Sequence, residues 1–264
     1  MANKIVRCRN CKNKKLINLF SLGNIKFTGK FPNKNQNIPF GKLELVLCSR
    51  CKLVQLRQNF NLKYLYNKDY GYRTGINKTM TNHVKAVVKN LSRKAILKNG
   101  DNVLDIASND GTLLNFYNKN ITTWGMDPIL NKFKKNYNNI NFKINNFFNY
   151  KKIQKLNKKV KFKIITALSV FYDLENPNIF LNGIKKLLHK NGIFYLEFQD
   201  LLKIIKNNMF DTICHEHLEY YSVTFINNIL NKHKLRIFDH NYNDINGGSS
   251  CYFICHDDAD FNTK

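Results

Sequence analysis

Two pairs of cysteines near the N-terminus have the spacing of metal-binding knuckles. Two residues separate Cys8 from Cys11, and two separate Cys48 from Cys51. This gap lets both thiolates of a pair face one ion, and two pairs supply the four sulfur ligands of a closed tetrahedral zinc site. Since protein groups fill all four positions, we expect a structural zinc ion that stabilises the fold of this segment.

An acidic loop follows a short apolar segment, residues 102–106. Asp105 lies near the end of that segment, and Asp127 ends the next one about 20 residues further on, where a carboxylate can accept hydrogen bonds from both ribose hydroxyls of a nucleoside. The loop lacks the Gly-x-x-x-x-Gly-Lys of a phosphate cradle, and its carboxylates would repel a pyrophosphate. The cationic sulfonium and amino groups of S-adenosylmethionine suit these residues better.

The predicted cofactor site continues after the third apolar segment. There a side-chain amide and an aromatic ring, Asn146 and Phe147, could hold the adenine, whereas we expect the next residue, Phe148, to belong to the core. The residues that we expect around the cofactor are Asp105, Ala107, Ser108, Asn109, Gly111, Asp127, Pro128, Asn146 and Phe147.

A third cluster places two imidazoles and two carboxylates in the five residues 215–219. Its histidines are two residues apart, whereas two metal ligands on one helix face are four apart, as in His-Glu-x-x-His, so the cluster does not predict a metalloprotease. A histidine titrates near neutral pH and can act as a general base, and an adjacent carboxylate such as Glu216 can orient it and stabilise its protonated form. The cluster is therefore a candidate acid–base centre.

Short apolar segments and stretches of helical periodicity must position these residues. We expect a mostly helical segment over residues 61–98, a helix that begins near Gly111, and strands at residues 102–106, 122–126, 140–144, 162–168, 192–198, 235–240 and 250–255. Such alternation predicts a mostly parallel sheet covered on both faces, with the last two strands as an antiparallel pair at its edge. This α/β plan matches the Rossmann-like, seven-stranded fold of class I methyltransferases.

The composition is strongly basic. The net charge is +25, and lysine is spread over almost every segment, usually beside asparagine. A nucleic-acid partner would favour clustered basic residues. We therefore interpret the lysine excess as solvated surface and keep a functional basic surface as the alternative.

The apolar segments also bear on location. The longest are far shorter than the roughly 20 residues of a membrane-spanning helix. The N-terminus lacks the apolar stretch of a signal peptide, and seven cysteines without such a signal point to metal binding or reduced thiols. We expect a cytoplasmic protein with no membrane partner.

Taken together, these residues resemble the sugar C-methyltransferases of deoxysugar biosynthesis, which have an N-terminal zinc-binding domain, a central S-adenosylmethionine domain and a C-terminal domain. The resemblance covers nearly the whole chain. It rests on the two cysteine pairs, residues 70–75 with Met80 and His83, and residues 104–114, 171–177, 211–222 and 247–249. It implies a zinc-binding domain at residues 1–60, a methyltransferase domain at 61–256, and the start of an otherwise missing C-terminal domain at 257–264.

The resemblance implies a reaction at carbon, on a nucleotide-linked keto-deoxysugar as substrate. A sugar carbon next to a ketone becomes acidic because the enolate spreads its charge onto oxygen. We expect His217 to remove that proton and Glu216 to support it. Tyr72 or Tyr70, together with His215, would polarise the ketone. Which histidine is the base stays open, and the same base could serve methylation of a sugar hydroxyl.

Three positions depart from the family pattern. Ala107 stands where glycine is usual in the cofactor loop, and Cys214 stands where some members have tyrosine. A histidine that some members carry after the fourth strand is absent from residues 167–173, so its role is vacant or reassigned.

Two other functions stay open on the sequence. An RNA methyltransferase would share the zinc, the charge and the cofactor fold, but would need a concentrated basic face with aromatic platforms. The second alternative is a chain that holds zinc and cofactor without turnover. The intact run of His215, Glu216 and His217 argues against that alternative.

Overall fold

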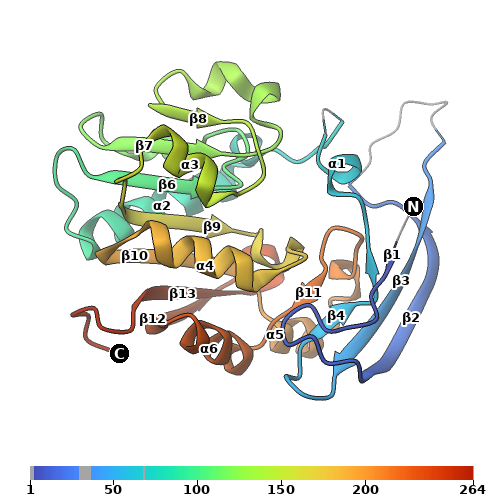
Figure 1. Cartoon of the computed structure of the whole chain (residues 1–264). Coiled ribbons are helices and arrows are strands. Elements are labelled where there is room, and N and C mark those ends of the chain that lie inside the picture. The colour runs from blue at the N-terminus through green and yellow to red at the C-terminus, as the bar shows by residue number, and fades with distance from the viewer. Residues whose placement is uncertain (1–2, 30–36, 68, 264) are drawn as a thin grey trace.

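A computed structural model describes residues 3–29, 37–67 and 69–263. Two main sheets organise these residues (Figure 1). A seven-stranded sheet with helices on both faces lies on the left of Figure 1, and a smaller four-stranded sheet lies on the right. The functional residues predicted from the sequence fall on both parts and on the segments between them.

The larger sheet has the strand order β12-β13-β10-β9-β6-β7-β8. Strand β13 runs antiparallel to both of its neighbours, and the other neighbouring pairs are parallel. This arrangement confirms the predicted class I methyltransferase fold. The strands are β6 (Asn102–Ile106), β7 (Thr122–Met126), β8 (Phe142–Ile144), β9 (Phe162–Leu168), β10 (Leu188–Gln199), β12 (Leu235–Asn243) and β13 (Ser249–His256).

Two apolar layers cover the faces of this sheet. Phe194, Leu196 and Phe198 of β10 pack beneath α3, α4 and α6, whereas Ile193 and Tyr195 pack with α2 on the other face (Figure 1). Successive side chains of a strand point to opposite faces, so a strand covered on both sides reads as a continuous apolar run. The α-helices are α1 (Leu62–Leu65), α2 (Lys78–Lys94), α3 (Tyr150–Leu156), α4 (Pro177–Leu187), α5 (Leu201–Lys206) and α6 (Val223–Lys232).

The smaller sheet has the order β11-β4-β3-β2. Its strand β11 comes from a distant part of the chain and pairs with β4. It follows residues 215–217, which we call the His-Glu-His cluster. The cluster is therefore anchored on the N-terminal sheet. The strands here are β2 (Leu16–Lys26), β3 (Phe40–Cys48), β4 (Val54–Leu56) and β11 (Glu219–Tyr220), beside a separate pair, β1 (Asn3–Lys4) with β5 (Gln58–Asn59).

The prediction of a helix that begins near Gly111 is wrong. The segment between β6 and β7 forms turns and one short 3-10 helix. Gly111 has a φ of +77°, and the Asn115 side chain donates hydrogen bonds to the carbonyls of Gly111 (3.1 Å) and Asn136 (3.0 Å). A side chain that binds nearby carbonyls competes with helix formation. The 3-10 helices are η1 (Thr74–Ile76), η2 (Leu114–Phe116), η3 (Leu130–Tyr137), η4 (Phe171–Asp173), η5 (Phe210–Thr212) and η6 (Ile245–Gly247).

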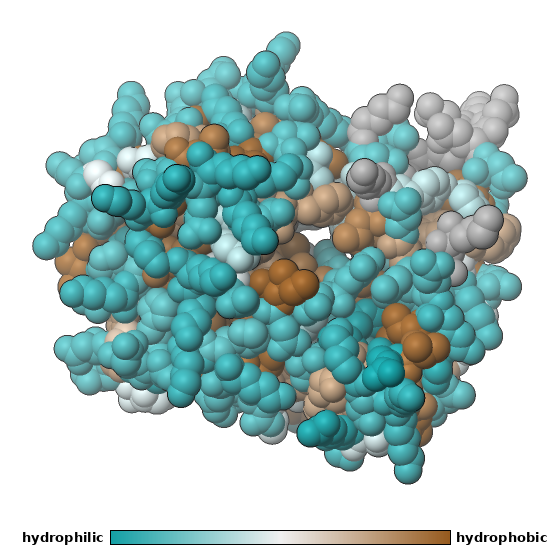
Figure 2. Space-filling model, viewed as in Figure 1, coloured by the Kyte–Doolittle hydropathy of each residue, from teal (hydrophilic) through white to brown (hydrophobic). Residues whose placement is uncertain are grey.

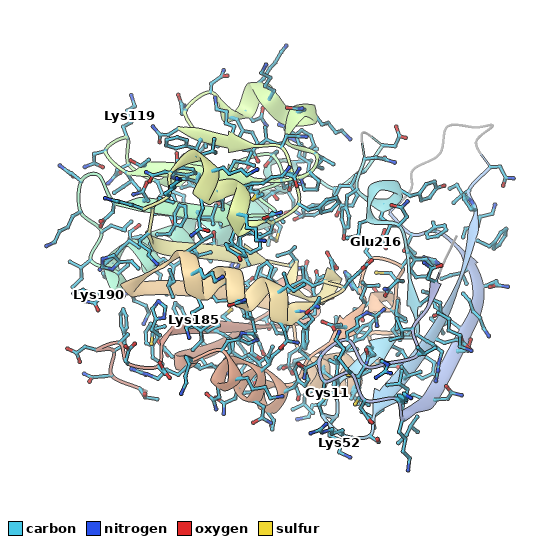
Figure 3. The ribbon with its side chains drawn as sticks, viewed as in Figure 1. Cys11, Lys52, Lys119, Lys185, Lys190 and Glu216 are labelled. Atoms are coloured by element: carbon cyan, nitrogen blue, oxygen red, sulfur yellow. The ribbon has the colours of Figure 1, made fainter. Side chains whose placement is uncertain are left out.

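Hydrophilic side chains cover most of the visible surface (Figure 2). The lysines labelled in Figure 3, which are Lys52, Lys119, Lys185 and Lys190, lie at separate places on that surface. In the described part of the chain, no helix combines the length and the apolar character that crossing a bilayer requires.

Candidate active site

One cavity of about 1350 Å³ lies between the carboxyl ends of the parallel strands and the N-terminal sheet. Thr28, residues 70–74, the loop after β6, and several residues between 209 and 217 contribute to its lining. Figure 2 shows the molecular face hollowed between the two parts. A site for one small molecule typically measures roughly 300–1,000 Å³, so this cavity has room for a cofactor and an acceptor together.

The loop after β6 turns sharply at the carboxyl edge of the sheet. Ala107 and Asn109 have positive φ angles of 57° and 48°, and the Ala107 N–H donates to the carbonyl of Met126 at the end of β7 (2.8 Å). A left-handed backbone favours glycine, so Ala107 holds a conformation that glycine adopts more readily than alanine. The turn exposes loop backbone where open α/β sheets bind their ligands.

Two buried carboxylates flank this loop. Asp105 accepts a hydrogen bond from Thr166 Oγ1 (2.6 Å), and Asp127 accepts from the backbone N–H groups of Asn109 (2.9 Å) and Ile129 (2.7 Å). Burial raises the pKa of Asp105 to about 7 and that of Asp127 to about 6. Neither forms an ion pair with another described residue. Buried carboxylates without a protein cation fit a positively charged ligand such as S-adenosylmethionine.

Residues 70–75 fold over the cofactor loop. Arg73 Nε lies 2.9 Å from Asp110 Oδ2, in an ion pair whose carboxylate is fully buried. The Gly75 N–H donates to the same oxygen (3.0 Å), and a Cβ atom at position 75 would lie 2.7 Å from it. The close approach therefore requires glycine, and it fixes this segment as one wall of the cavity.

The structure brings most of the predicted cofactor residues to the cavity. Asp127 lies between two lining residues but directs its oxygens at backbone N–H groups, and Gly111 faces Ile140 and Tyr137 instead of the cavity. Those that line the cavity are Asp105, Ala107, Ser108, Asn109, Pro128 and Phe147; those that do not are Gly111, Asp127 and Asn146.

His217 lines the cavity. Its Nδ1 donates a hydrogen bond to the Thr212 carbonyl (2.8 Å), which leaves Nε2 as the unprotonated nitrogen, and its ring packs on Tyr172 with centroids 4.1 Å apart. Burial lowers the pKa of His217, so the imidazole is neutral at pH 7. A neutral imidazole held through Nδ1 can accept a proton at Nε2.

Glu216 also lines the cavity, at the junction of the two parts of the molecule (Figure 3). Thr28 Oγ1 donates to its Oε2 (2.6 Å), whereas Oε1 is buried and has no partner among the described residues. The charge of Glu216 raises the pKa of His217, against the effect of burial. Glu216 can therefore stabilise His217 once it is protonated.

The structure places His215 outside the cavity. It is fully buried, its Nδ1 accepts from the Thr28 N–H (3.3 Å), and its Nε2 donates to the Gly41 carbonyl (3.2 Å). The ring packs against Phe27 and Phe60, with centroids 4.4 and 4.9 Å away. Both nitrogens are engaged within the protein, so His215 is not brought to a position where it could polarise a bound ketone.

The two predicted tyrosines lie on the wall formed by residues 70–75. Both line the cavity, and 45% of Tyr72 is exposed to solvent. Burial raises the pKa of Tyr70, and the nearby carboxyl groups of Asp173 and Glu216 raise it further. Tyr70 therefore lies nearer than Tyr72 to the end of the cavity that carries Asp173 and Glu216.

The sequence did not identify three further residues at this end. Thr28 holds Glu216, and the Tyr66 hydroxyl donates to Asp173 Oδ2 (2.7 Å); all three missed residues line the cavity. A signal existed for Asp173, because it lies in the run 171–177 and in the segment where a family histidine is absent. Thr28 and Tyr66 stand in no motif.

The four cysteines of the N-terminal knuckles come together. Their sulfur atoms all lie within 4.8 Å of one another. Lys12 and Lys52 have φ angles of 61° and 60°, and their N–H groups close tight turns onto the carbonyls of Cys8 (3.1 Å) and Cys48 (3.0 Å). The Gln55 side chain donates to Cys8 Sγ (3.3 Å). Converging thiols with donors to sulfur fit a bound zinc ion.

Two family models match different parts of the chain. The family model described as "Methyltransferase domain" matches residues 76–239. A second, described as "Putative zinc binding domain", matches residues 8–66.

Individual relatives add detail. The C-methyltransferase NovU of Streptomyces niveus is 25% identical over 98% of this chain, which spans 63% of the length of NovU. An S-adenosylmethionine-dependent methyltransferase from Clostridium acetobutylicum superimposes with a TM-score of 0.53 at 13% identity, covering 67% of this chain and 92% of that one. The plantazolicin methyltransferase BpumL gives a TM-score of 0.52 at 12% identity, covering 68% and 86%. At these identities, the two structures support the fold alone.

Proposed function

We propose that this chain, which belongs to the methyltransferase domain family, is an S-adenosylmethionine-dependent methyltransferase that methylates a carbon beside the ketone of a nucleotide-linked deoxysugar. The observation that carries this proposal is His217, whose neutral ring lines the same cavity as the cofactor loop and keeps Nε2 available as a base. The likeness to a C-methyltransferase over nearly the whole chain supports carbon as the acceptor atom.

The loop after β6 and the end of β7 hold the cofactor in this proposal. S-adenosylmethionine, when bound, supplies a methyl group activated by a positively charged sulfur. The buried carboxylates of Asp105 and Asp127 provide the matching negative charge. Asp127 holds the loop in place through its hydrogen bonds with the N–H groups of Asn109 and Ile129, and Phe147 offers a ring for the adenine.

His217 removes the proton from the acceptor carbon at Nε2. The Thr212 carbonyl keeps the proton on Nδ1 and so fixes the tautomer that makes Nε2 basic. Glu216 stabilises the resulting imidazolium, and Thr28 holds the Glu216 carboxylate in place. Tyr70 is the tyrosine that we assign to the ketone, since more of Tyr72 lies in solvent.

We assign His215 a positioning role instead of contact with the ketone. Its ring and its two hydrogen bonds join the His-Glu-His cluster to Thr28 and Gly41 of the N-terminal part. A zinc ion on the four cysteines would stabilise the sheet that carries these contacts. Zinc therefore supports the acceptor side of the site without entering the reaction.

Methyl transfer from labelled S-adenosylmethionine to a panel of nucleotide-linked keto-deoxysugars tests the proposal. We expect one or more sugars to acquire a methyl group, and NMR of the product to show a carbon–methyl bond. His217→Ala should abolish product while S-adenosylhomocysteine still binds. His233→Ala is the matched control, because His233 bonds to Asn178 and does not line the cavity.

Other products would decide between the alternatives. Label on a sugar hydroxyl would replace carbon by oxygen as the acceptor. Label in RNA, with none in the sugars, would overturn the proposed substrate class.

A further inference from the structure

Asp173 is a buried carboxyl group at the acceptor end of the cavity that the proposed reaction does not yet use. It ends η4, just beyond β9, and lines the cavity. Tyr66 donates a hydrogen bond to Asp173 Oδ2 (2.7 Å). The other oxygen, Oδ1, is buried and has no partner among the described residues. A buried oxygen without a partner is uncommon in folded proteins, and a ligand in the cavity that Asp173 lines can supply the missing hydrogen bond.

The surroundings of Asp173 favour its neutral form. Burial raises the pKa of Asp173 well above its usual value, and the charge of Glu216 raises it further, whereas the Tyr66 hydrogen bond lowers it. The other titratable groups that interact with it are Tyr70, Tyr172, Cys214, Tyr220 and Tyr221. None of these is a cation, and among the described residues Asp173 forms no ion pair.

The hydrogen bond from Tyr66 also locates the acid proton. With Oδ2 accepting from the Tyr66 hydroxyl, a neutral Asp173 would have Oδ2 as its carbonyl oxygen and its proton on Oδ1. In that form Asp173 would hold an O–H donor for which the described residues provide no acceptor. His217 packs on Tyr172, the residue before Asp173 in the chain, and lines the same cavity as Asp173.

We propose that Asp173 is a neutral carboxylic acid whose Oδ1–H donates a hydrogen bond to the ketone oxygen of the acceptor. The inference rests on the proposed function, because it needs an acceptor with a ketone beside the reacting carbon. It gives Asp173 the ketone-polarising role that the sequence assigned to His215.

The proton-removal step moves two electron pairs. The C–H bond breaks, the proton passes to Nε2 of His217, the C–H electron pair forms a carbon–carbon double bond, and the ketone π pair moves onto oxygen. The hydrogen bond from Asp173 stabilises that oxygen as negative charge develops. In methyl transfer the oxygen pair would re-form the ketone, the carbon–carbon double-bond pair would form the carbon–methyl bond, and the methyl–sulfur bond would break with its pair left on the sulfur of S-adenosylhomocysteine. Asp173 keeps its proton throughout.

Infrared difference spectroscopy tests the protonation state without any acceptor. At pH 7, with S-adenosylhomocysteine bound, the spectrum of the wild type minus that of Asp173→Asn should contain the carbonyl band of a protonated carboxylic acid. Glu219→Gln is the control, because Glu219 is a second buried acid, with a pKa raised to about 8, that does not line the cavity. The band that Asp173→Asn removes should remain in the spectrum of Glu219→Gln. A carboxylate band in place of the acid band would overturn the inference.

The pH dependence of turnover tests the catalytic role. The rate should fall at alkaline pH as Asp173 ionises, and Tyr66→Phe should move that fall to higher pH because it removes the interaction that lowers the Asp173 pKa. Asp173→Asn keeps a donor and should lose the alkaline fall. Asp173→Ala should lower kcat by about 10²–10³-fold, the usual loss for one donor to a developing oxyanion.

These outcomes separate the inference from the proposed function. If no ketosugar is methylated, the proposed function fails, while the acid band at pH 7 would still support a neutral Asp173. If ketosugars are methylated and Asp173→Ala retains the wild-type kcat and pH profile, the inference fails alone. Unchanged S-adenosylhomocysteine affinity in each variant excludes misfolding as the cause of lost turnover.

Discussion

The proposed cofactor side and the proposed acceptor side of the cavity are assembled in different ways. The cofactor side consists largely of loops at the ends of two adjacent parallel strands, β6 and β7, so its key residues lie close together in sequence. The acceptor side brings together Thr28, Tyr66, Asp173, Glu216 and His217, which come from four separate segments.

This difference has a physical consequence. The cofactor side depends on the packed core of the larger sheet, whereas the acceptor side depends on contact between the His-Glu-His cluster and the N-terminal sheet. Strand β11 and the Thr28 hydrogen bonds make that contact. Perturbations of the N-terminal part should therefore affect the acceptor side first.

The largest predicted effect is that of disrupting the cysteine cluster. Structural zinc contributes about 10–16 kcal/mol to the folding of small domains, so Cys48→Ser should unfold the N-terminal sheet and abolish turnover. S-adenosylmethionine affinity, measured by calorimetry, should change much less. Cys255→Ser is the control because it removes a buried thiol outside the cluster. Normal turnover in a zinc-free Cys48→Ser protein would show that the acceptor side does not need this sheet.

The next largest effect distinguishes the two histidines of the cluster. His217→Gln should lower kcat by about 10²–10⁴-fold, the range for loss of a general base, with little change in thermal stability. His215→Gln should instead lower the free energy of unfolding by about 1–3 kcal/mol, because it disturbs buried hydrogen bonds. Thermal unfolding and kcat measured on both variants test this contrast, and the reverse pattern would exchange the two roles.

A smaller effect is predicted for the pH dependence of cofactor binding. The raised pKa values of Asp105 and Asp127, about 7 and about 6, mean that both take up protons as pH falls through this range. A cationic ligand prefers the ionised forms, so S-adenosylmethionine should bind more weakly at pH 5.5 than at pH 8, by up to about tenfold per pH unit for each group. Calorimetric titrations at both pH values measure this.

The stability of the ligand-free protein should depend on pH in the direction opposite to cofactor binding. Between pH 4 and 7 the ligand-free folded protein binds more protons at these two carboxyls than the unfolded chain, so their contribution to stability rises as pH falls. Asp127→Asn should weaken the pH dependence of cofactor affinity and that of stability. If both stay unchanged in this variant, Asp127 does not cause them.

The smallest predicted effect concerns the strained cofactor loop. Ala107→Gly relieves a left-handed residue but increases the entropy of the unfolded chain, so the net gain in stability should be about 0.5 kcal/mol. Ala95→Gly, at the end of α2, is the control and should destabilise because Ala95 has an ordinary right-handed backbone. Melting temperatures of the two variants test the difference, and a loss of stability in Ala107→Gly would show that the loop is unstrained.

The sequence predicted the local features of the fold well. The strand positions at residues 102–106, 122–126 and 162–168 are confirmed, because apolar segments bounded by turn residues determine them locally. The four-cysteine cluster is confirmed for the same reason, since its spacing is a local property. The helix near Gly111 failed because the Asn115 side chain and the positive φ of Gly111 favour turns.

The acceptor side could be predicted only in part. His217 and Glu216 carry a recognisable motif, but their division of roles from His215 depends on which side chains face the cavity. That orientation follows from the pairing of β11 with β4 and from the packing of His215 on Phe27, both of which are long-range contacts. No spacing rule in one segment reports such contacts.

The most direct test of the account is hydrogen exchange on a ketosugar that the enzyme methylates. In deuterated water with S-adenosylhomocysteine in place of the methyl donor, NMR should show the wild type exchanging the proton beside the ketone, and His217→Gln failing to do so. That result would establish His217 as the base at the acceptor carbon. Exchange at the wild-type rate in His217→Gln would contradict the central claim.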